Sequence, residues 1–407
     1  MWRRSGKCAG DRVCVGVDVC ENNRKEDGMN NPVWLMTSAF PKLTFAQVVR
    51  KAKAAGAQGL ELCVFRRDGT RQDHVATHLN YETFGLHDAK KVLETAAKEN
   101  LRFSVGAYDN LLGGPPEVCE ANRNHILKLI RIAHLLGGDA NDVCVGTFVG
   151  YNHDLGKEDG GFAKNLDLYA EVFKPIVKYA EGLGVTLTYE NCPMEGWRPA
   201  SAPTTYNNLP CTLAARKLMY ALIPSKAHGE TYDPSHDAWQ NIDPVDVIKN
   251  TDFSRLHRVH VKGTRNRAGS LAAVQWGRLY PMQQVDARLA KRAGVCQPAC
   301  EWDRHHYDPK LPGFGGSDSI DWAAFLKVLM DMGFDRPFVI ENEADNSSHT
   351  GNAAATMQGF AATVMNLAPA IWSLDAEKGW WFNPKRLRQL RPAAKRDVPV
   401  VTMKDLK

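Results

Sequence analysis

The segment VWLMTSAFPKLTFAQVVRKAKAAGAQGLELCVF (Val33–Phe65) contains two β-rich runs with an amphipathic helix between them. Thr44 can cap this helix, its apolar residues recur on one face from Phe45 to Ala52, and Gly56 can end it. A β-rich run that leads through a helix straight into another β-rich run is typical of an α/β fold.

The same alternation continues along the chain. Six further β-rich runs follow, separated by helical stretches: Leu101–Tyr108, Asp142–Gly150, Val185–Cys192, His228–His236, Arg255–Gly263 and Pro337–Asp345. Eight such runs predict a (β/α)8 TIM barrel, an α/β fold. A doubly wound sheet is the structural alternative, but no GxGxxG follows the first run and no GxxxxGK[ST] occurs anywhere.

The 407 residues divide into three expected parts. Residues 1–28 are expected to form a disordered leader or extension, and residues 29–372 the barrel, with a long insertion at about 264–316 between strands 7 and 8. Residues 373–407 form a basic C-terminal extension, which we expect to be solvated or to wrap a neighbouring subunit. We expect the insertion to be ordered and to cover the C-terminal mouth of the barrel.

The distribution of charge argues against nucleic acid as a partner. The net charge is +5, and residues 375–407 alone carry nine Lys or Arg and four Asp or Glu, which leaves residues 1–374 neutral. An enzyme of nucleic acids is expected to carry its positive charge around the active site. No run approaches the length of a membrane span, and ten dispersed cysteines without a secretory leader indicate reduced thiols. We therefore expect a cytoplasmic protein that binds neither nucleic acid nor membrane.

Catalytic groups of a (β/α)8 barrel lie at the C-terminal ends of its strands. The last four β-rich runs all end in carboxylate or imidazole, at Glu190, Asp233, His260 and Glu341. Burying such groups costs several kcal/mol unless they are paired or bind a metal. Three oxygen donors and one imidazole suit Mn²⁺, the expected cofactor, with Mg²⁺, Co²⁺ and Zn²⁺ as alternatives.

Four strings then identify a family resemblance. They are ENCPMEGW (190–197), YDPSHDAWQNIDP (232–244), VHVKG (259–263) and PGFGGSDSIDWAAFLKVLMDMGFDRPFVIENEAD (312–345). In this order they resemble the xylose-isomerase-like superfamily, the sugar phosphate isomerases/epimerases, over roughly residues 33–370.

The resemblance implies roles for particular residues. It implies that Glu190, Asp233, His260 and Glu341 hold the metal, and that Glu190 and Glu341 are also the catalytic acid/base pair. It further implies that His236 contacts substrate or metal. Gly263 departs from the pattern, because many relatives have an Asp at this position.

Four other residues are candidates for the site. His153 follows the fourth run closely, at the end of the barrel where catalytic groups are expected, and is a candidate acid or base. Lys262 can polarise a carbonyl or bind an oxyanion, and a salt bridge to a strand-end carboxylate is its alternative role. Trp197 can stack on a sugar ring or serve only in packing. Arg304, in the insertion, is a candidate for substrate binding.

The leading functional hypothesis is a divalent-metal-dependent isomerase or epimerase of a sugar or keto-sugar. It would abstract a proton next to a carbonyl through a metal-stabilised enediolate. The alternative is a lyase on the same scaffold, resembling inosose dehydratases or the catalytic subunits of C-glycoside deglycosidases, which act by enolisation and elimination. A repair endonuclease of the same fold would need more His ligands and a basic groove, and a non-catalytic binding protein would have little need of both glutamates.

The sequence leaves the identity of the sugar open. It contains no Gly-rich phosphate cradle, which favours an unphosphorylated substrate. We expect a homo-oligomer, with a second small subunit as an alternative arrangement.

Overall fold

The computed structural model describes residues 31–68, 78–137, 144–194, 207–266, 275, 286–296, 307–310, 318–343, 363 and 396–406. Within these ranges the strands of the main sheet are β1 (Val33–Met36), β2 (Gly59–Cys63), β3 (Arg102–Ala107), β4 (Cys144–Thr147), β5 (Thr186–Glu190), β6 (His228–Tyr232), β7 (Leu256–Val261) and β10 (Phe338–Ile340). All their neighbouring pairs are parallel, and the order β1-β10-β7-β6-β5-β4-β3-β2 closes into a barrel. The predicted (β/α)8 fold is confirmed, and each of the eight β-rich runs contains a strand.

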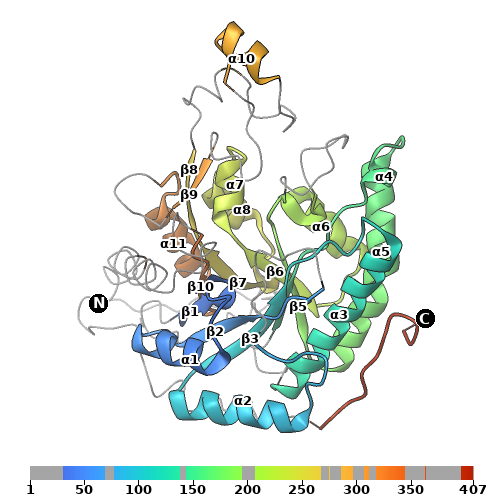
Figure 1. Ribbon diagram of the computed structural model, residues 1–407, viewed down its shortest axis with the longest axis vertical. Helices are drawn as coiled ribbons and strands as arrows, with labels where there is room; N and C mark the ends of the chain where they lie inside the picture. Colours follow the sequence, from blue (N-terminus) through green and yellow to red (C-terminus); the bar gives the residue numbers. More distant parts are fainter. Residues whose placement is uncertain are drawn as a thin grey trace, which may run out of the picture.

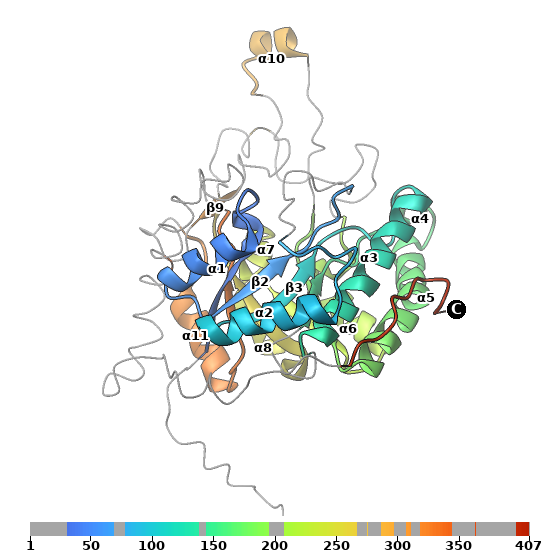
Figure 2. The ribbon, with the colours of Figure 1, turned by 60° about the horizontal axis from the view of Figure 1, so that its bottom comes forward.

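Helices surround this barrel, as Figures 1 and 2 show from two directions. They are α1 (Phe45–Ala54), α2 (Leu86–Glu99), α3 (Pro116–Leu135), α4 (His153–Gly156), α5 (Gly161–Gly182), α6 (Leu213–Leu222), α7 (Pro234–Trp239), α8 (Pro244–Asn250) and α11 (Trp322–Asp331). Thr44 caps α1 as predicted, because its side chain accepts a hydrogen bond from Gln47 N. The face of α1 that packs on the sheet carries Val48, Val49 and Ala52, all buried. No helix in the described ranges is long and apolar enough to cross a membrane.

The insertion after β7 begins with a strand that the sequence did not predict. β8 (Gly263–Asn266) pairs antiparallel with β9 (Tyr307–Lys310), so the two ends of the insertion leave the barrel together as a ribbon. Between them, α10 (Ala287–Ala293) stands apart from the barrel in both Figures 1 and 2. Most of the insertion lies outside the described residues, and the expected cover over the mouth stays a prediction. The homo-oligomer is also still a prediction.

The end of the basic extension contacts its own chain at a few points. Residues 396–406 lie against α3 of their own chain, where Arg131 donates to Val398 O at 2.5 Å and pairs with Asp397 Oδ1 at 2.5 Å. Met403 N donates to Asn124 Oδ1 at 2.8 Å, and the Met403 side chain is buried. The described end of the tail is therefore anchored to α3 at these points, while most of its residues stay exposed, and a contact with a neighbouring subunit stays a prediction.

Close packing between β1 and β2 leads to a stability prediction. Gly59 pairs with Trp34, and a Cβ at position 59 would lie 2.4 Å from Cε2 of that buried indole. We expect Gly59→Ala to lower the free energy of unfolding by about 1–3 kcal/mol, the usual cost of overpacking. Gly182→Ala is the control, since nothing lies within 4 Å of the added Cβ. Urea unfolding of both variants measures the difference, and equal stabilities would contradict the predicted clash.

Buried histidines give the protein a pH-dependent stability. Burial lowers the pKa of His125 and of His228 from 6.5 to about 4, and that of His257 to about 3. Between pH 6.5 and about 4 the unfolded chain therefore binds protons that the folded chain does not, so stability falls as the pH falls through this window. Each histidine contributes up to about 1.4 kcal/mol per pH unit.

We expect the melting temperature to decrease across this window, and His125→Gln to make the decrease less steep. The glutamine can still donate to Val64 O, which accepts from His125 Nε2 at 2.6 Å. His87→Gln, at an exposed histidine, is the control. A slope equally steep in the wild type and in both variants would show that burial of His125 does not contribute.

Candidate metal centre

The strand ends deliver four ligand candidates to one end of the barrel. Glu190 is the last residue of β5, and His260 is the penultimate residue of β7. Asp233 and Glu341 directly follow β6 and β10. Because these strands are parallel neighbours in the closed barrel, their C-terminal ends meet at the same rim.

Glu190, His260 and Glu341 form the compact part of this site. One donor atom from each lies within 4.8 Å of the others, and all three residues are buried. Nδ1 of His260 lies 3.4 Å from Glu341 Oε2 and 3.8 Å from Glu190 Oε2. An imidazole nitrogen thus faces two carboxylates in a place that solvent barely reaches.

Asp233 uses its two oxygens differently. Oδ1 accepts a hydrogen bond from Ser235 N at 2.8 Å and so caps α7. Oδ2 points to the site, 3.2 Å from His236 Nε2 and 3.1 Å from Lys262 Nζ. The Asp-Pro sequence explains this arrangement, since Pro234 begins the helix and leaves its cap residue at the rim.

The ammonium of Lys262 joins Asp233 to the other carboxylates. Its Nζ lies 3.0 Å from Glu341 Oε2 and 2.9 Å from Glu343 Oε2. Burial lowers the pKa of Lys262, but its carboxylate neighbours outweigh burial and raise the pKa well above 10.5. Lys262 is therefore a permanent cation in this site, and the salt bridge that was its alternative role is present.

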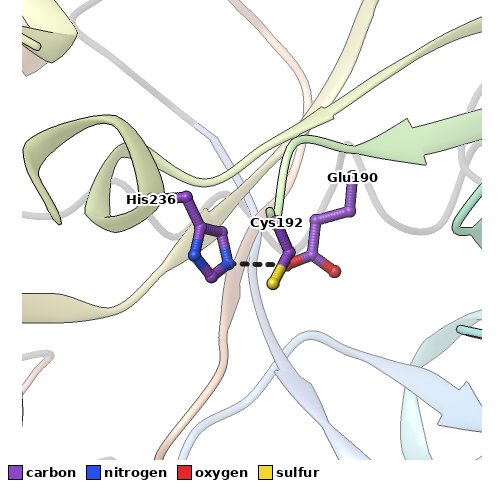
Figure 3. A group of neighbouring side chains, drawn as sticks. All are labelled: Glu190, Cys192 and His236. Atoms are coloured by element: carbon purple, nitrogen blue, oxygen red, sulfur yellow. Dashed lines mark hydrogen bonds and ion pairs between the residues drawn. The ribbon is translucent and has the colours of Figure 1, made fainter. Parts of the chain in front are cut away.

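Figure 3 shows a second group of donors around Glu190. His236, from α7, places Nε2 3.1 Å from Glu190 Oε1, and the thiol of Cys192, just past β5, lies beside both. Donor atoms of Glu190, Cys192 and His236 are again within 4.8 Å of one another. The two oxygens of Glu190 therefore face different partners, His236 on one side and His260 on the other.

Their surroundings shift the pKa values of Glu190 and Glu341 in opposite directions. Burial and the nearby carboxylate of Glu341 raise the pKa of Glu190. Burial also acts to raise the pKa of Glu341, but the Lys262 ammonium outweighs it, and the pKa falls to about 2. Glu190 is accordingly the more easily protonated of the pair, and Glu341 is the carboxylate that stays ionised.

A small cavity opens onto these groups. Its charged lining consists of Glu190, His236, Lys262, Glu341 and Glu343. Its apolar and aromatic lining consists of Met36, Phe65, Tyr108, Phe148, Cys192 and Met194. The mixture of a few polar groups with aromatic walls is typical of small-molecule sites.

The donor set fits a divalent metal. Within the described part of the chain, His260 Nδ1 and Asp233 Oδ2 are buried atoms without a hydrogen bond of acceptable geometry. His260 Nδ1 faces two carboxylates, and the donor atoms of Glu190, His260 and Glu341 lie close enough together to hold one cation. One imidazole nitrogen and three carboxylates match a site for Mn²⁺ or a similar cation.

His153 is not among the residues that line the cavity, and two other predicted residues lie outside the described part of the chain. His153 begins α4, and its Nε2 lies 2.8 Å from Asn207 Oδ1, so the structure places it beside Asn207 and not among the described cavity residues. Trp197 and Arg304 lie outside the described residues, and their expected contacts with substrate stay predictions.

Sequence reasoning missed Glu61 and Cys192. Glu61 lies in the middle of β2, has no exposed surface, and touches His260 across the barrel. Burial raises the pKa of Glu61, but Arg258 and His260 outweigh it and lower the pKa to about 2. A lone carboxylate inside the apolar run GLELCVF (59–65) was a signal that could have found Glu61. No comparable signal distinguished Cys192 from the other dispersed cysteines.

Comparison with known families finds one match to the sequence. A family model described as xylose isomerase-like TIM barrel matches residues 49–363, which is most of the chain. A search of curated proteins gives no match.

Solved structures share the fold at low sequence identity. A probable 3-DHS dehydratase, AsbF, from Bacillus anthracis is 15% identical with a TM-score of 0.51, and the match covers 82% of this chain and 98% of that one. An L-ribulose 3-epimerase is 13% identical with a TM-score of 0.53, covering 85% and 96%. A D-psicose 3-epimerase from Clostridium cellulolyticum H10, solved with D-tagatose, is 13% identical with a TM-score of 0.51, covering 84% and 99%.

Proposed function

The chain belongs to the xylose isomerase-like TIM barrel family, and from this premise we propose that it is a divalent-metal-dependent isomerase or epimerase of a sugar or keto-sugar. One observation carries the proposal. Glu190 and Glu341 line the same small cavity and face the same imidazole, that of His260. Two carboxyl groups that converge on one cavity are the minimum needed to take a proton from carbon and to return it.

Glu190, Asp233, His260 and Glu341 would hold the metal, with Mn²⁺ expected and Mg²⁺, Co²⁺ or Zn²⁺ as alternatives. When bound, the cation supplies positive charge beside a substrate carbonyl, which favours loss of a proton from the adjacent carbon. The donor atoms of Glu190, His260 and Glu341, which lie within 4.8 Å of one another, support three of these ligands.

Side chains of the protein would transfer the proton and bind the substrate. One glutamate takes the proton, and the other returns it to the opposite face or to the neighbouring carbon. Return to the opposite face is epimerisation, and return to the neighbouring carbon is isomerisation. Lys262 and His236 can bind substrate oxygens, while Tyr108 and Phe148 offer aromatic surface to the apolar face of a sugar and exclude water.

The charges at the cavity favour an unphosphorylated substrate. Among the described cavity residues, the ammonium of Lys262 already pairs with the carboxylates of Glu341 and Glu343. It also lies 3.1 Å from Asp233 Oδ2. A phosphate group placed here would meet carboxylates before it met an unpaired cation. The expected substrate is therefore a neutral sugar or keto-sugar.

A lyase is the second candidate, and Lys262 is the observation that favours it. Its ammonium lines the cavity and stays charged, so it can stabilise negative charge on an oxygen that departs from the substrate. Elimination of a β-substituent develops such charge on the leaving group. Proton abstraction next to a carbonyl is common to both candidates, and they differ in the second step, which is either return of the proton to carbon or departure of the substituent.

Incubation with substrates in D₂O, followed by NMR, separates these outcomes. We expect the Mn²⁺-loaded protein to incorporate deuterium at carbon in at least one member of a panel of neutral keto-sugars and 3-keto-glycosides. Chelator-treated protein is the control and should not promote exchange. Rearranged sugar as product supports the isomerase, loss of a substituent supports the lyase, and absence of exchange over the whole panel would reject both.

A further inference from the structure

Glu61 is a buried carboxylate that the proposed reaction leaves unused. It lies on β2, while His260 lies on β7, and these strands are not neighbours in the barrel. Nevertheless Glu61 Oε2 lies 3.1 Å from His260 Nε2, so the contact crosses the barrel interior. Both side chains are without exposed surface.

Other groups hold Glu61 in place. Arg258 NH1 lies 2.5 Å from Glu61 Oε2, and the hydroxyl of Tyr108 donates to Glu61 Oε1. Arg258 is anchored in turn by Ser104 Oγ at 2.9 Å. The carboxylate thus has a fixed position, since two partners besides His260 constrain its two oxygens.

Glycines on β3 and β4 leave space for this carboxylate. A Cβ added at Gly106 on β3, or at Gly146 on β4, would lie 2.8 Å from Glu61 Oε1. Any side chain at these positions would therefore collide with Glu61. The absence of a side chain at both positions is what allows a carboxylate to reach His260 across the interior.

We propose that Glu61 is a positioning residue for the metal centre. By accepting a hydrogen bond from Nε2 of His260, it directs the lone pair of Nδ1 toward Glu190 and Glu341. This orientation agrees with the distances of Nδ1 to those carboxylates, 3.8 and 3.4 Å. A histidine ligand whose second nitrogen donates to a carboxylate is oriented in its ring and is a stronger ligand. The inference rests on the metal centre of the proposed function.

Glu61→Gln tests this role, with Glu230→Gln as the matched control. Glu230 is also a buried glutamate paired with a buried arginine, because its Oε2 lies 3.3 Å from Arg216 Nε, but it is on β6 and does not contact His260. We expect Glu61→Gln to weaken Mn²⁺ binding by roughly 10–100-fold, the usual cost of losing such an outer partner. Glu230→Gln should change the affinity by less than about threefold, since it touches no ligand.

A spectroscopic measurement separates positioning from general damage. In wild-type protein loaded with ¹¹³Cd²⁺ and labelled with ¹⁵N-histidine, we expect a cadmium–nitrogen coupling to Nδ1 of His260. Replacement of His260 by Asn assigns the signal. Glu61→Gln should reduce this coupling or move it to Nε2, and Glu230→Gln should leave it intact.

The outcomes distinguish this inference from the proposed function. A wild-type protein that binds neither Mn²⁺ nor Cd²⁺ would overturn the metal centre together with the role of Glu61. Metal binding through Nε2 in the wild type, or unchanged affinity and coupling in Glu61→Gln, would overturn the role of Glu61 alone. If Glu61→Gln does not fold, Tyr108→Phe removes one partner of Glu61 and keeps the Arg258 pair. Its affinity should fall by roughly fivefold, more than in Glu230→Gln, and a change no larger than in that control would reject the proposal.

Discussion

Replacing Asp233 with alanine should remove the metal and, with it, the deuterium exchange. Asp233 Oδ2 is a buried carboxylate oxygen that faces the site, 3.1 Å from Lys262 Nζ and 3.2 Å from His236 Nε2. We expect Mn²⁺ affinity to fall by roughly 100-fold or more, because a direct ligand contributes more than the outer partners that contribute 10–100-fold. Titration calorimetry measures the affinity, and NMR in D₂O measures the exchange.

Asp243→Ala is the matched control for this variant. Asp243 precedes Pro244 and caps α8 by accepting from Val245 N, as Asp233 precedes Pro234 and caps α7. Each substitution therefore removes an Asp-Pro helix cap, at a cost of about 1 kcal/mol in stability. Loss of metal in Asp233→Ala alone supports the ligand assignment. Full metal occupancy in Asp233→Ala would show that Asp233 is only a cap.

Glu341→Gln should stop proton transfer while leaving substrate binding largely intact. The Lys262 ammonium holds the pKa of Glu341 down at about 2, so Glu341 is an ionised base that glutamine cannot replace. A positioned general base contributes roughly 10²–10⁴-fold, and we expect deuterium exchange to decrease by about that factor. The Michaelis constant should change by less than about tenfold. Metal content is measured on the same sample, because glutamine keeps one oxygen donor.

Glu343→Gln is the comparison for Glu341→Gln. Both glutamates line the cavity and contact Lys262, at 3.0 Å for Glu341 and 2.9 Å for Glu343. A substitution that acts only by releasing Lys262 should therefore affect exchange equally in the two variants. We expect the loss in Glu343→Gln to be less than about tenfold. Equal losses would assign the effect to Lys262 and remove Glu341 from the role of base.

Much of the fold was predictable because its information is local. The capping residue Thr44, the apolar face of α1 and the stop at Gly56 lie within one short segment, and the structure has α1 where they predict it. The β8–β9 ribbon was not predicted, since its strands pair across the whole insertion. Pairing over such a separation has no signature in either strand alone.

Local patterns also explain why some site residues were found and others missed. Glu190 and Glu341 stand at strand ends, and chain order alone implies that such residues share a rim. His153 was expected just after the fourth β-rich run, but β4 ends at Thr147, and His153 begins α4 with its imidazole beside Asn207. The sequence shows how close a residue is to the end of a strand. It does not show where a side chain beyond the strand points, because that depends on the conformation of the following loop.

By itself, the sequence determined that the chain forms a parallel barrel and that Glu190, Asp233, His260 and Glu341 lie at one end of it. Helices between successive strands require all strands to run in the same direction. The residue at the C-terminal end of each strand must therefore lie at the same end of the barrel. Closure of the sheet into a barrel determined the contacts between these residues and others. It brought the Lys262 ammonium between Asp233 and Glu341, and it brought Glu61 to His260 from a strand that is not its neighbour. Such contacts depend on strand stagger and on which side chains point inward, and these are properties of the closed sheet and not of any one strand.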